Sequence, residues 1–143
     1  MMCKGENCGC GRNLGLLLLR LVLGVVFIYH GWGKITNIGG TQAFFSSIGL
    51  GNIALVYLAA YGEFIGGILM ILGMWTCYAG IVLAIISLVA LLTVHLPKGF
   101  NIMQGGYEYI LTLLVLSVSV AMMGAGKYSV RGMSKMQSTD QKM

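Results

Sequence analysis

Four long apolar runs, separated by short polar segments, dominate the chain. They cover residues 14–31, 53–73, 76–96 and 107–124. Each is close to the roughly 20 residues that a helix needs to cross a bilayer. Met74 and Trp75 separate the second run from the third, which predicts a tight antiparallel hairpin. The pattern therefore predicts an all-α bundle of four transmembrane helices. A short helix, capped by Thr41, is expected in the longest connection.

Composition supports an integral membrane protein. The chain is 57% hydrophobic and 9% charged, with a mean hydropathy of +0.86. Soluble domains average about 25% charged residues, so these charges could not cover a soluble core. The length of 143 residues fits one domain. The net charge of +5 is explained by basic residues that flank membrane spans, and it is no signal for nucleic acid.

Basic residues are distributed unevenly between the two sides of the bundle. With four spans both termini lie on one side, together with Lys4, Arg12, Lys127, Arg131, Lys135 and Lys142. The opposite side carries Lys34 and Lys98. The positive-inside rule therefore predicts cytoplasmic termini. The sequence divides into a flexible cysteine-containing head (1–13), the membrane domain (14–130) and a disordered basic tail (131–143).

Two charged residues fall inside the predicted spans. A helix rises about 1.5 Å per residue, which places Glu63 about 15 Å deep, near the midplane, and Arg20 about 9 Å from the cytoplasmic end. A charge at the bilayer centre costs about 2.5–3.5 kcal/mol on insertion scales, so Glu63 needs a partner, a proton or water. The sequence predicts that the long side chain of Arg20 reaches Glu63.

A second set of polar residues gathers at the outer ends of the spans. Its members are His30, Trp32, Lys34, His95, Lys98 and Glu108. One hypothesis makes His30, His95 and Glu108 the wall of a polar pocket whose floor is Glu63, with Arg20 beside it. In the other, the side chains only snorkel to the headgroup level, and Glu108 complements a helix dipole. Lys34, Lys98 and Trp32 are weaker candidates for substrate binding.

The two halves of the sequence echo each other. The first reads "HGWGK", a connection, then "YGEFIGG"; the second reads "HLPKG", a shorter connection, then "GGYEY". Each half runs from the inside out and back, which predicts two duplicated helix pairs related by an axis along the membrane normal. The spacing "GEFIG" favours close packing of helices.

Four cysteines fall on the side that is predicted to be reducing, where structural disulfides are rare. They are Cys3, Cys8, Cys10 and Cys77. The spacing C-x-x-x-x-C-x-C in the head matches no standard zinc motif, so no metal site is predicted. Thiolate binding of zinc or copper(I) by these cysteines stays open as the weaker alternative.

The order of these motifs resembles the DoxX family of small four-helix bacterial membrane proteins. The matching positions are Arg20, His30, Gly31, Lys34, Glu63, Gly66, Gly67, His95, Glu108, Gly124, Gly126 and Ser129. The resemblance covers residues 14–130 and implies a multi-pass protein of the bacterial inner membrane. It also implies a link to oxidoreductase complexes, because founding members resemble subunits of a thiosulfate:quinone oxidoreductase and others are tied to thiol and oxidative stress.

Two functional hypotheses follow. In the first, the protein is the membrane subunit of an oxidoreductase complex that handles quinone or small thiol and sulfur species. It would then act with soluble or membrane redox partners rather than alone, and a quinone would be its cofactor. In the second, it is a non-catalytic membrane anchor or a conduit for a small solute or protons. The sequence contains no recognisable motif for a flavin, haem or nucleotide, and it leaves the oligomeric state open.

Overall fold

The computed structural model describes residues 8–130, and all regular secondary structure in this part of the chain is helical. Its elements are α1 (Cys8–Thr36), α2 (Ile38–Ser47), α3 (Ile53–Leu72), α4 (Thr76–Ala90), the π-helix η1 (Leu91–His95), the 3₁₀ turns η2 (Leu96–Lys98) and η3 (Ile102–Gln104), and α5 (Glu108–Met123). No strand occurs in this part of the chain.

Three of the helical segments are long and apolar enough to cross a membrane. They are Gly11–Thr36, Ile53–Leu72 and Thr76–Lys98. The fourth predicted span contains α5, an apolar helix of 16 residues that rises about 24 Å. The prediction of an all-α membrane protein is confirmed, whereas four complete spans and cytoplasmic termini stay predictions.

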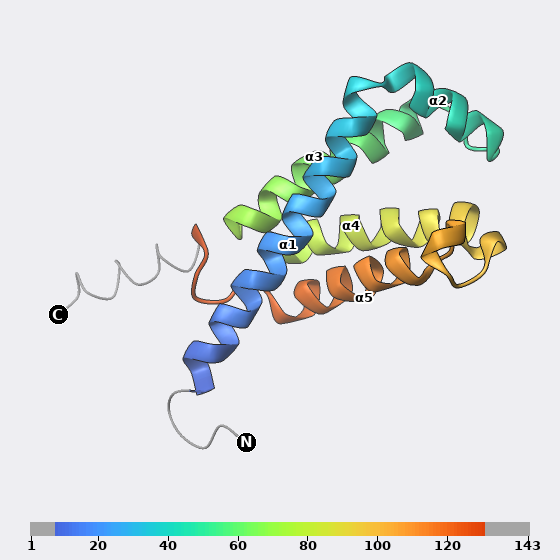
Figure 1. The fold of residues 1–143 in the computed structure, drawn as a ribbon. Coiled ribbons are helices and arrows are strands. Elements are labelled where there is room, and N and C mark those ends of the chain that lie inside the picture. Colours follow the sequence, from blue (N-terminus) through green and yellow to red (C-terminus); the bar gives the residue numbers. More distant parts are fainter. Residues whose placement is uncertain (1–7, 131–143) are drawn as a thin grey trace.

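The helices form two pairs that diverge from a common meeting point. The most extensive contacts join α1 to α3 and α4 to α5, which are the helices of each predicted half. Figure 1 shows α1 and α3 rising together towards α2, while α4 and α5 run away beside each other. We call the end that carries α2 and the 96–107 connection the Lys34 end. The opposite end, with the α3–α4 turn and residues 124–130, is the Arg20 end.

The turn between α3 and α4 is as tight as predicted, and the helices that it joins remain in contact as far as Gly62 and Ile86. Gly73 ends α3 in the left-handed conformation with φ 70°, and Trp75 precedes α4 with φ 47°. The predicted antiparallel hairpin is therefore present, although α3 makes its most extensive contacts with α1 and α4 makes its most extensive contacts with α5.

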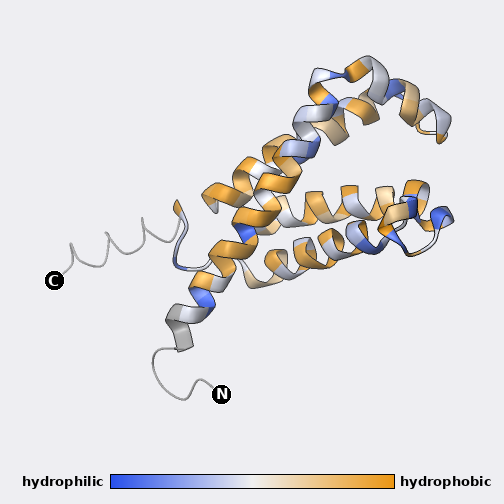
Figure 2. Ribbon diagram, in the orientation of Figure 1, coloured by the Kyte–Doolittle hydropathy of each residue, from blue (hydrophilic) through white to orange (hydrophobic). Residues whose placement is uncertain are grey.

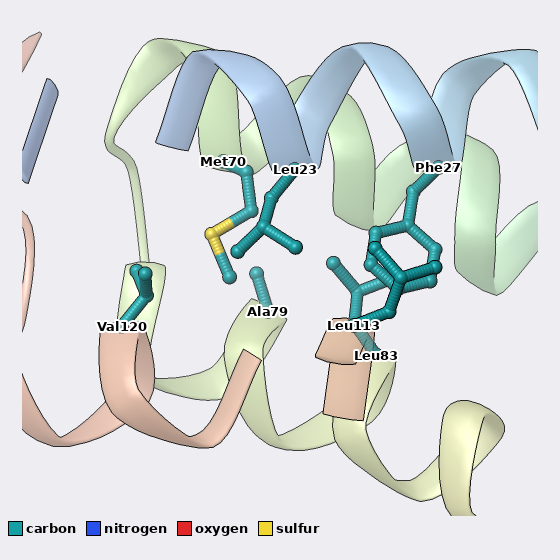
Figure 3. Packing of buried hydrophobic residues seen from close by; sticks show 7 residues of the cluster. All are labelled: Leu23, Phe27, Met70, Ala79, Leu83, Leu113 and Val120. Atoms are coloured by element: carbon teal, nitrogen blue, oxygen red, sulfur yellow. The ribbon is translucent and has the colours of Figure 1, made fainter. Parts of the chain in front are cut away.

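A small apolar core lies where the pairs meet. Figure 3 shows Leu23 and Phe27 of α1 facing Leu83 of α4 and Leu113 of α5, with Met70 of α3 alongside. Figure 2 shows hydrophobic residues along every long helix, and many of the large ones are exposed. In a chain with these spans, the exposed apolar surface is the surface that lipid covers.

Glycines let α1 and α3 approach each other closely. A Cβ on Gly31 would lie 2.5 Å from the backbone nitrogen of Phe64, and one on Gly24 would lie 2.8 Å from the carbonyl oxygen of Gly67. The predicted glycine pair of "GEFIG" instead faces α4, where Gly66 contacts Leu83. Small residues at such crossings bring helix backbones together, and this crossing sets the position of the last turn of α1 above α3.

Several helix boundaries differ from the prediction. α1 extends from Cys8 to Thr36, beyond both ends of the predicted span 14–31. The short helix in the long connection is present as α2, but its cap is Asn37, whose side-chain oxygen accepts a hydrogen bond from the backbone nitrogen of Gly40 at 3.1 Å. Thr41 lies inside α2 and donates to the carbonyl of Asn37, so the predicted cap was wrong.

Candidate functional site

An ion pair between α1 and α3 forms the centre of the candidate site. Lys34 Nζ donates to Glu63 Oε2, and the side chains are 26% and 8% exposed, respectively. Gly31 lies one turn before Lys34 and presses against Phe64, the residue after Glu63. The close helix crossing therefore places the ammonium group over the buried carboxylate.

Aromatic side chains and an imidazole surround this ion pair. His30 interacts electrostatically with both Lys34 and Glu63. Its ring lies 6.3 Å, centroid to centroid, from the ring of Tyr109, which comes from α5. On the other side of α1, the rings of Trp32 and Phe64 are 5.9 Å apart. The contact between His30 and Tyr109 links the two helix pairs at the Lys34 end.

An open groove of about 590 Å³ adjoins the ion pair. The last turns of α1 form one wall and α2 forms the other, and we call it the α1–α2 groove. Its aromatic lining comes from Tyr29, Trp32, Phe44 and Phe45, and Lys34 supplies a cation. A groove of this kind suits a small ligand with a flat apolar body and a few polar acceptors.

Arg20 does not join this site. Its guanidinium group is buried at the Arg20 end, where it donates to the carbonyls of Met70, Ile71, Ala125 and Tyr128. The first two are among the last carbonyls of α3, which have no partner within the helix. The predicted pairing of Arg20 with Glu63 is wrong, because the carboxylate binds Lys34. Arg20 instead ties the segment after α5 to the end of α3.

The polar residues of the second half make a separate group. His95 Nδ1 lies 2.8 Å from the carbonyl oxygen of Gly105, and Glu108 Oε1 accepts a hydrogen bond from the backbone nitrogen of Ile102. Lys98 is exposed beside Gly105. All these contacts stabilise the connection between α4 and α5. The structure thus brings together His30, Lys34 and Glu63, and it leaves His95, Lys98 and Glu108 around the connection between α4 and α5.

Cysteine positions leave the metal hypothesis untested. Cys77 is exposed and forms no disulfide. Cys3 and the side chains of Cys8 and Cys10 lie outside the described part of the structure. Within the described part, no three histidine, cysteine, aspartate or glutamate side chains are grouped closely enough to hold a metal ion.

Sequence reasoning missed three contributors to the site. Tyr109 is one such residue, and its ring lies against His30. Phe44 and Phe45 are the others, and they line the groove beside Lys34. The adjacent phenylalanines are a signal in the sequence, but the side of α2 on which they lie follows only from the start of that helix at Ile38.

The fold and the site define a class: an all-α membrane protein whose first two long helices are joined by a lysine–glutamate ion pair beside an aromatic groove. The chain belongs to the DoxX family, whose model matches residues 15–96. This match includes both members of the ion pair and the whole α1–α2 groove.

Relatives from three bacteria match most of the chain. "Putative oxidoreductase CatD" of Bacillus subtilis (strain 168) is 37% identical over 113 residues, which cover 79% of this chain and 81% of that protein. "Inner membrane protein YqjF" of Escherichia coli (strain K12) is 29% identical over 121 residues, covering 83% and 91%. An "Uncharacterized protein" of Haemophilus influenzae (strain ATCC 51907 / DSM 11121 / KW20 / Rd) is 30% identical over 141 residues, covering 90% and 87%. No solved structure matches the chain.

Proposed function

We propose that this protein is the membrane subunit of an oxidoreductase complex and that its α1–α2 groove binds the head of a quinone. The observation that carries the proposal is the combination of a groove with aromatic walls and a lysine cation held by a buried carboxylate. A partner subunit that carries the redox centre supplies the electrons. The oxidoreductase name of the 37% identical relative supports the same class of activity.

The chemistry of a quinone matches the side chains of the groove. A quinone head is a flat ring with two carbonyl acceptors, so it needs aromatic surfaces and hydrogen-bond donors. Trp32 and Phe44 offer the surfaces, and the ammonium group of Lys34 offers the donor. Reduction consumes two electrons from the partner and two protons, which yields the quinol. His30, beside the ion pair, hands on protons, and Glu63 keeps Lys34 in place.

Orientation is part of the proposal. We place both termini in the cytoplasm and the Lys34 end outside, in the bacterial inner membrane. The basic asymmetry supports this orientation, and the printed name of the E. coli relative supports the membrane. In a variant without native cysteines, Asn101→Cys should react with a membrane-impermeant maleimide in intact cells. Reaction only after the cells are permeabilised would reverse the orientation.

The two tryptophans allow a direct binding test, because they lie at opposite ends of the molecule. Trp75→Phe leaves Trp32 in the groove as the fluorescent reporter, and Trp32→Phe leaves Trp75 at the Arg20 end as the control. A short-chain quinone should quench the fluorescence of Trp75→Phe until the quenching saturates. In Trp32→Phe the quenching should only increase in proportion to quinone concentration. Equal quenching of both would contradict binding in the groove.

A matched pair of lysine variants then tests the polar contact. Lys34→Gln should raise the quinone concentration that gives half-maximal quenching by at least about tenfold, since a hydrogen bond from a charged donor contributes about 1.5–3 kcal/mol. Lys98→Gln, the counterpart in the second half, should leave it unchanged because Lys98 lies outside the groove. Native mass spectrometry of the protein in mild detergent should detect the bound quinone and the partner subunit.

A second candidate function is a conduit for protons or a small solute. The hydroxyls of Ser87 on α4 and Ser117 on α5 are fully buried, and neither has a hydrogen-bond partner within residues 8–130. Buried hydroxyls of this kind commonly bind water, and a hydrated path would favour conduction. Liposomes that contain the protein and a pH-sensitive dye distinguish the candidates, because only a conduit collapses an imposed pH gradient. Ser117→Ala should slow that collapse.

A further inference from the structure

The connection between α4 and α5 carries large apolar side chains on its outside. We call residues 99–107 the α4–α5 loop. Phe100 and Ile102 are exposed, and Met103, at the centre of the η3 turn, is 89% exposed. The loop lies outside the three segments that are long and apolar enough to cross a membrane. Contact between lipid and those spans therefore does not account for these exposed side chains.

The backbone of the α4–α5 loop is hydrogen-bonded to the loop itself. Every N–H group from residue 102 to residue 108 donates to an acceptor within residues 99–108, at distances of 2.8–3.1 Å. Two of these donors use side chains, the carboxamide oxygen of Asn101 and the carboxylate of Glu108. A loop in water can leave such groups to the solvent, but close to the apolar core an unsatisfied N–H group is costly. The loop can therefore approach hydrocarbon without stranding these donors.

The two ends of the loop touch, which keeps it compact. A Cβ on Gly106 would collide with the carbonyl oxygen of Gly99, so only a glycine fits at this point. His95 closes the loop from the end of η1, with Nδ1 2.8 Å from the carbonyl oxygen of Gly105. The polar backbone thus faces the interior of a closed loop, and the apolar side chains remain on its surface.

The length of α5 places this loop at the boundary of the apolar core. α5 has 16 residues and rises about 24 Å, less than a core thickness of about 30 Å. The segment Thr76–Lys98 has 23 residues and extends roughly 10 Å further. The two lie side by side from the Arg20 end onwards (Figure 1), where Gly80 packs against Ala121. The loop therefore returns from Lys98 to α5 across the level at which the core ends.

We propose that the α4–α5 loop is a lipid-contact element of this protein. Phe100, Ile102 and Met103 insert into the boundary between the headgroups and the acyl chains, and they continue the apolar surface of α5 beyond its short helix. Segments that lie in the membrane interface typically bury their apolar side chains by about 5–10 Å. The occupant of this surface is thus the bilayer and not a second protein.

The charged and polar groups of the loop suit a shallow position of this kind. Lys98 is exposed, and its long side chain can reach the phosphates of the headgroups. The carboxylate of Glu108 is held by the backbone nitrogen of Ile102. The backbone and Asn101 stay at the level of the headgroups, so Asn101→Cys remains within reach of a water-soluble maleimide.

The test places a single tryptophan at two neighbouring positions of η3 in the full-length protein. Trp32→Phe and Trp75→Phe remove the native tryptophans. Met103→Trp places the reporter at the tip, and Gln104→Trp is the matched control, because successive side chains of a 3₁₀ turn point about 120° apart. Both residues are exposed, so neither change disturbs the core. Each protein is placed in nanodiscs, where lipids brominated near the headgroup end of their acyl chains quench from the membrane and acrylamide quenches from water.

Brominated lipid should quench Met103→Trp at least about twofold more strongly than Gln104→Trp, because an inserted tip lies about 5–10 Å into the interface. Acrylamide should show the opposite order. A second measurement avoids tryptophan, which itself favours the interface. In protein without native cysteines, Met103→Cys should react with the water-soluble maleimide more slowly in nanodiscs than Gln104→Cys does.

Two results would overturn the proposal. One is equal quenching at the two positions by both reagents, which would mean that η3 has no face directed at lipid. The other is protection of Met103→Trp from both reagents, which would mean that a protein surface covers the tip. Either result leaves the quinone proposal untouched, because the loop contributes no residue to the α1–α2 groove.

Discussion

Replacing Lys34 with methionine tests the ion pair at the centre of the site. The variant leaves the carboxylate of Glu63, whose side chain is 8% exposed, without its cation. Removing one partner of a buried ion pair typically costs about 3–5 kcal/mol. Glu63→Gln should cost less, about 1–2 kcal/mol, because the Lys34 side chain is 26% exposed and can turn its ammonium group towards water. The asymmetry between the two single variants is a direct consequence of their unequal burial.

The double variant, Lys34→Met with Glu63→Gln, should recover much of the lost stability. The double variant contains no unpaired charge. Its loss of unfolding free energy should therefore be smaller, by about 2 kcal/mol, than the sum of the losses in the two single variants. Unfolding by SDS in mixed micelles, followed by far-UV circular dichroism, gives the four free energies of the cycle. A coupling below about 0.5 kcal/mol would refute the ion pair as a source of stability.

Arg20→Gln combined with Glu63→Gln provides the control cycle. The two side chains bind at opposite ends of the molecule and share no partner. Their effects should therefore add to within about 0.5 kcal/mol. Rescue in this cycle would mean that Arg20 pairs with Glu63 after all, contrary to the hydrogen bonds of the structure.

The remaining predictions concern three contacts elsewhere in the fold. Arg20→Gln should destabilise the protein by at least about 3 kcal/mol, because it strands several buried carbonyls, and residues 124–130 should then exchange amide hydrogens faster. Gly31→Ala should cost about 1–3 kcal/mol through overpacking, whereas Gly33→Ala, with no atom within 4 Å of the added Cβ, should be neutral or stabilising in the same SDS titration. His95→Ala should speed amide hydrogen exchange only in the connection between α4 and α5, where the His95 ring contacts the carbonyl of Gly105. Faster exchange throughout α4 would contradict this local role.

The sequence predicted the helices well because each is a long apolar run, and it placed the charged residues at the right ends. The error over Glu63 came from a helix boundary. The predicted first span stopped at residue 31, which put Lys34 in a loop. The helix in fact continues to Thr36, so Lys34 points from a rigid turn onto α3. One additional turn of helix changed the partner of the most deeply placed carboxylate.

Arg20 shows a different limit of prediction. The predicted depth of Arg20 in the membrane indicated the carboxylate of Glu63 as its partner. A guanidinium group has five donors, however, and can instead bind several carbonyls. The sequence held one hint: Gly73 marks the end of α3, where carbonyls lack partners within the helix. The other two acceptors, Ala125 and Tyr128, lie more than 100 residues away in sequence, and local patterns carry no information on such a contact.

The binding of Arg20 also has a consequence for synthesis in the cell. The residue enters the membrane early, with the first helix, but two of its four acceptors belong to the last residues of the domain. Until residues 125–128 leave the ribosome, the guanidinium group holds a charge in or near the bilayer with an incomplete set of partners. A truncated chain would keep that unsatisfied cation permanently. The contact that joins the first helix to the segment after α5 thus leaves Arg20 fully paired only in a chain that includes residues 125–128.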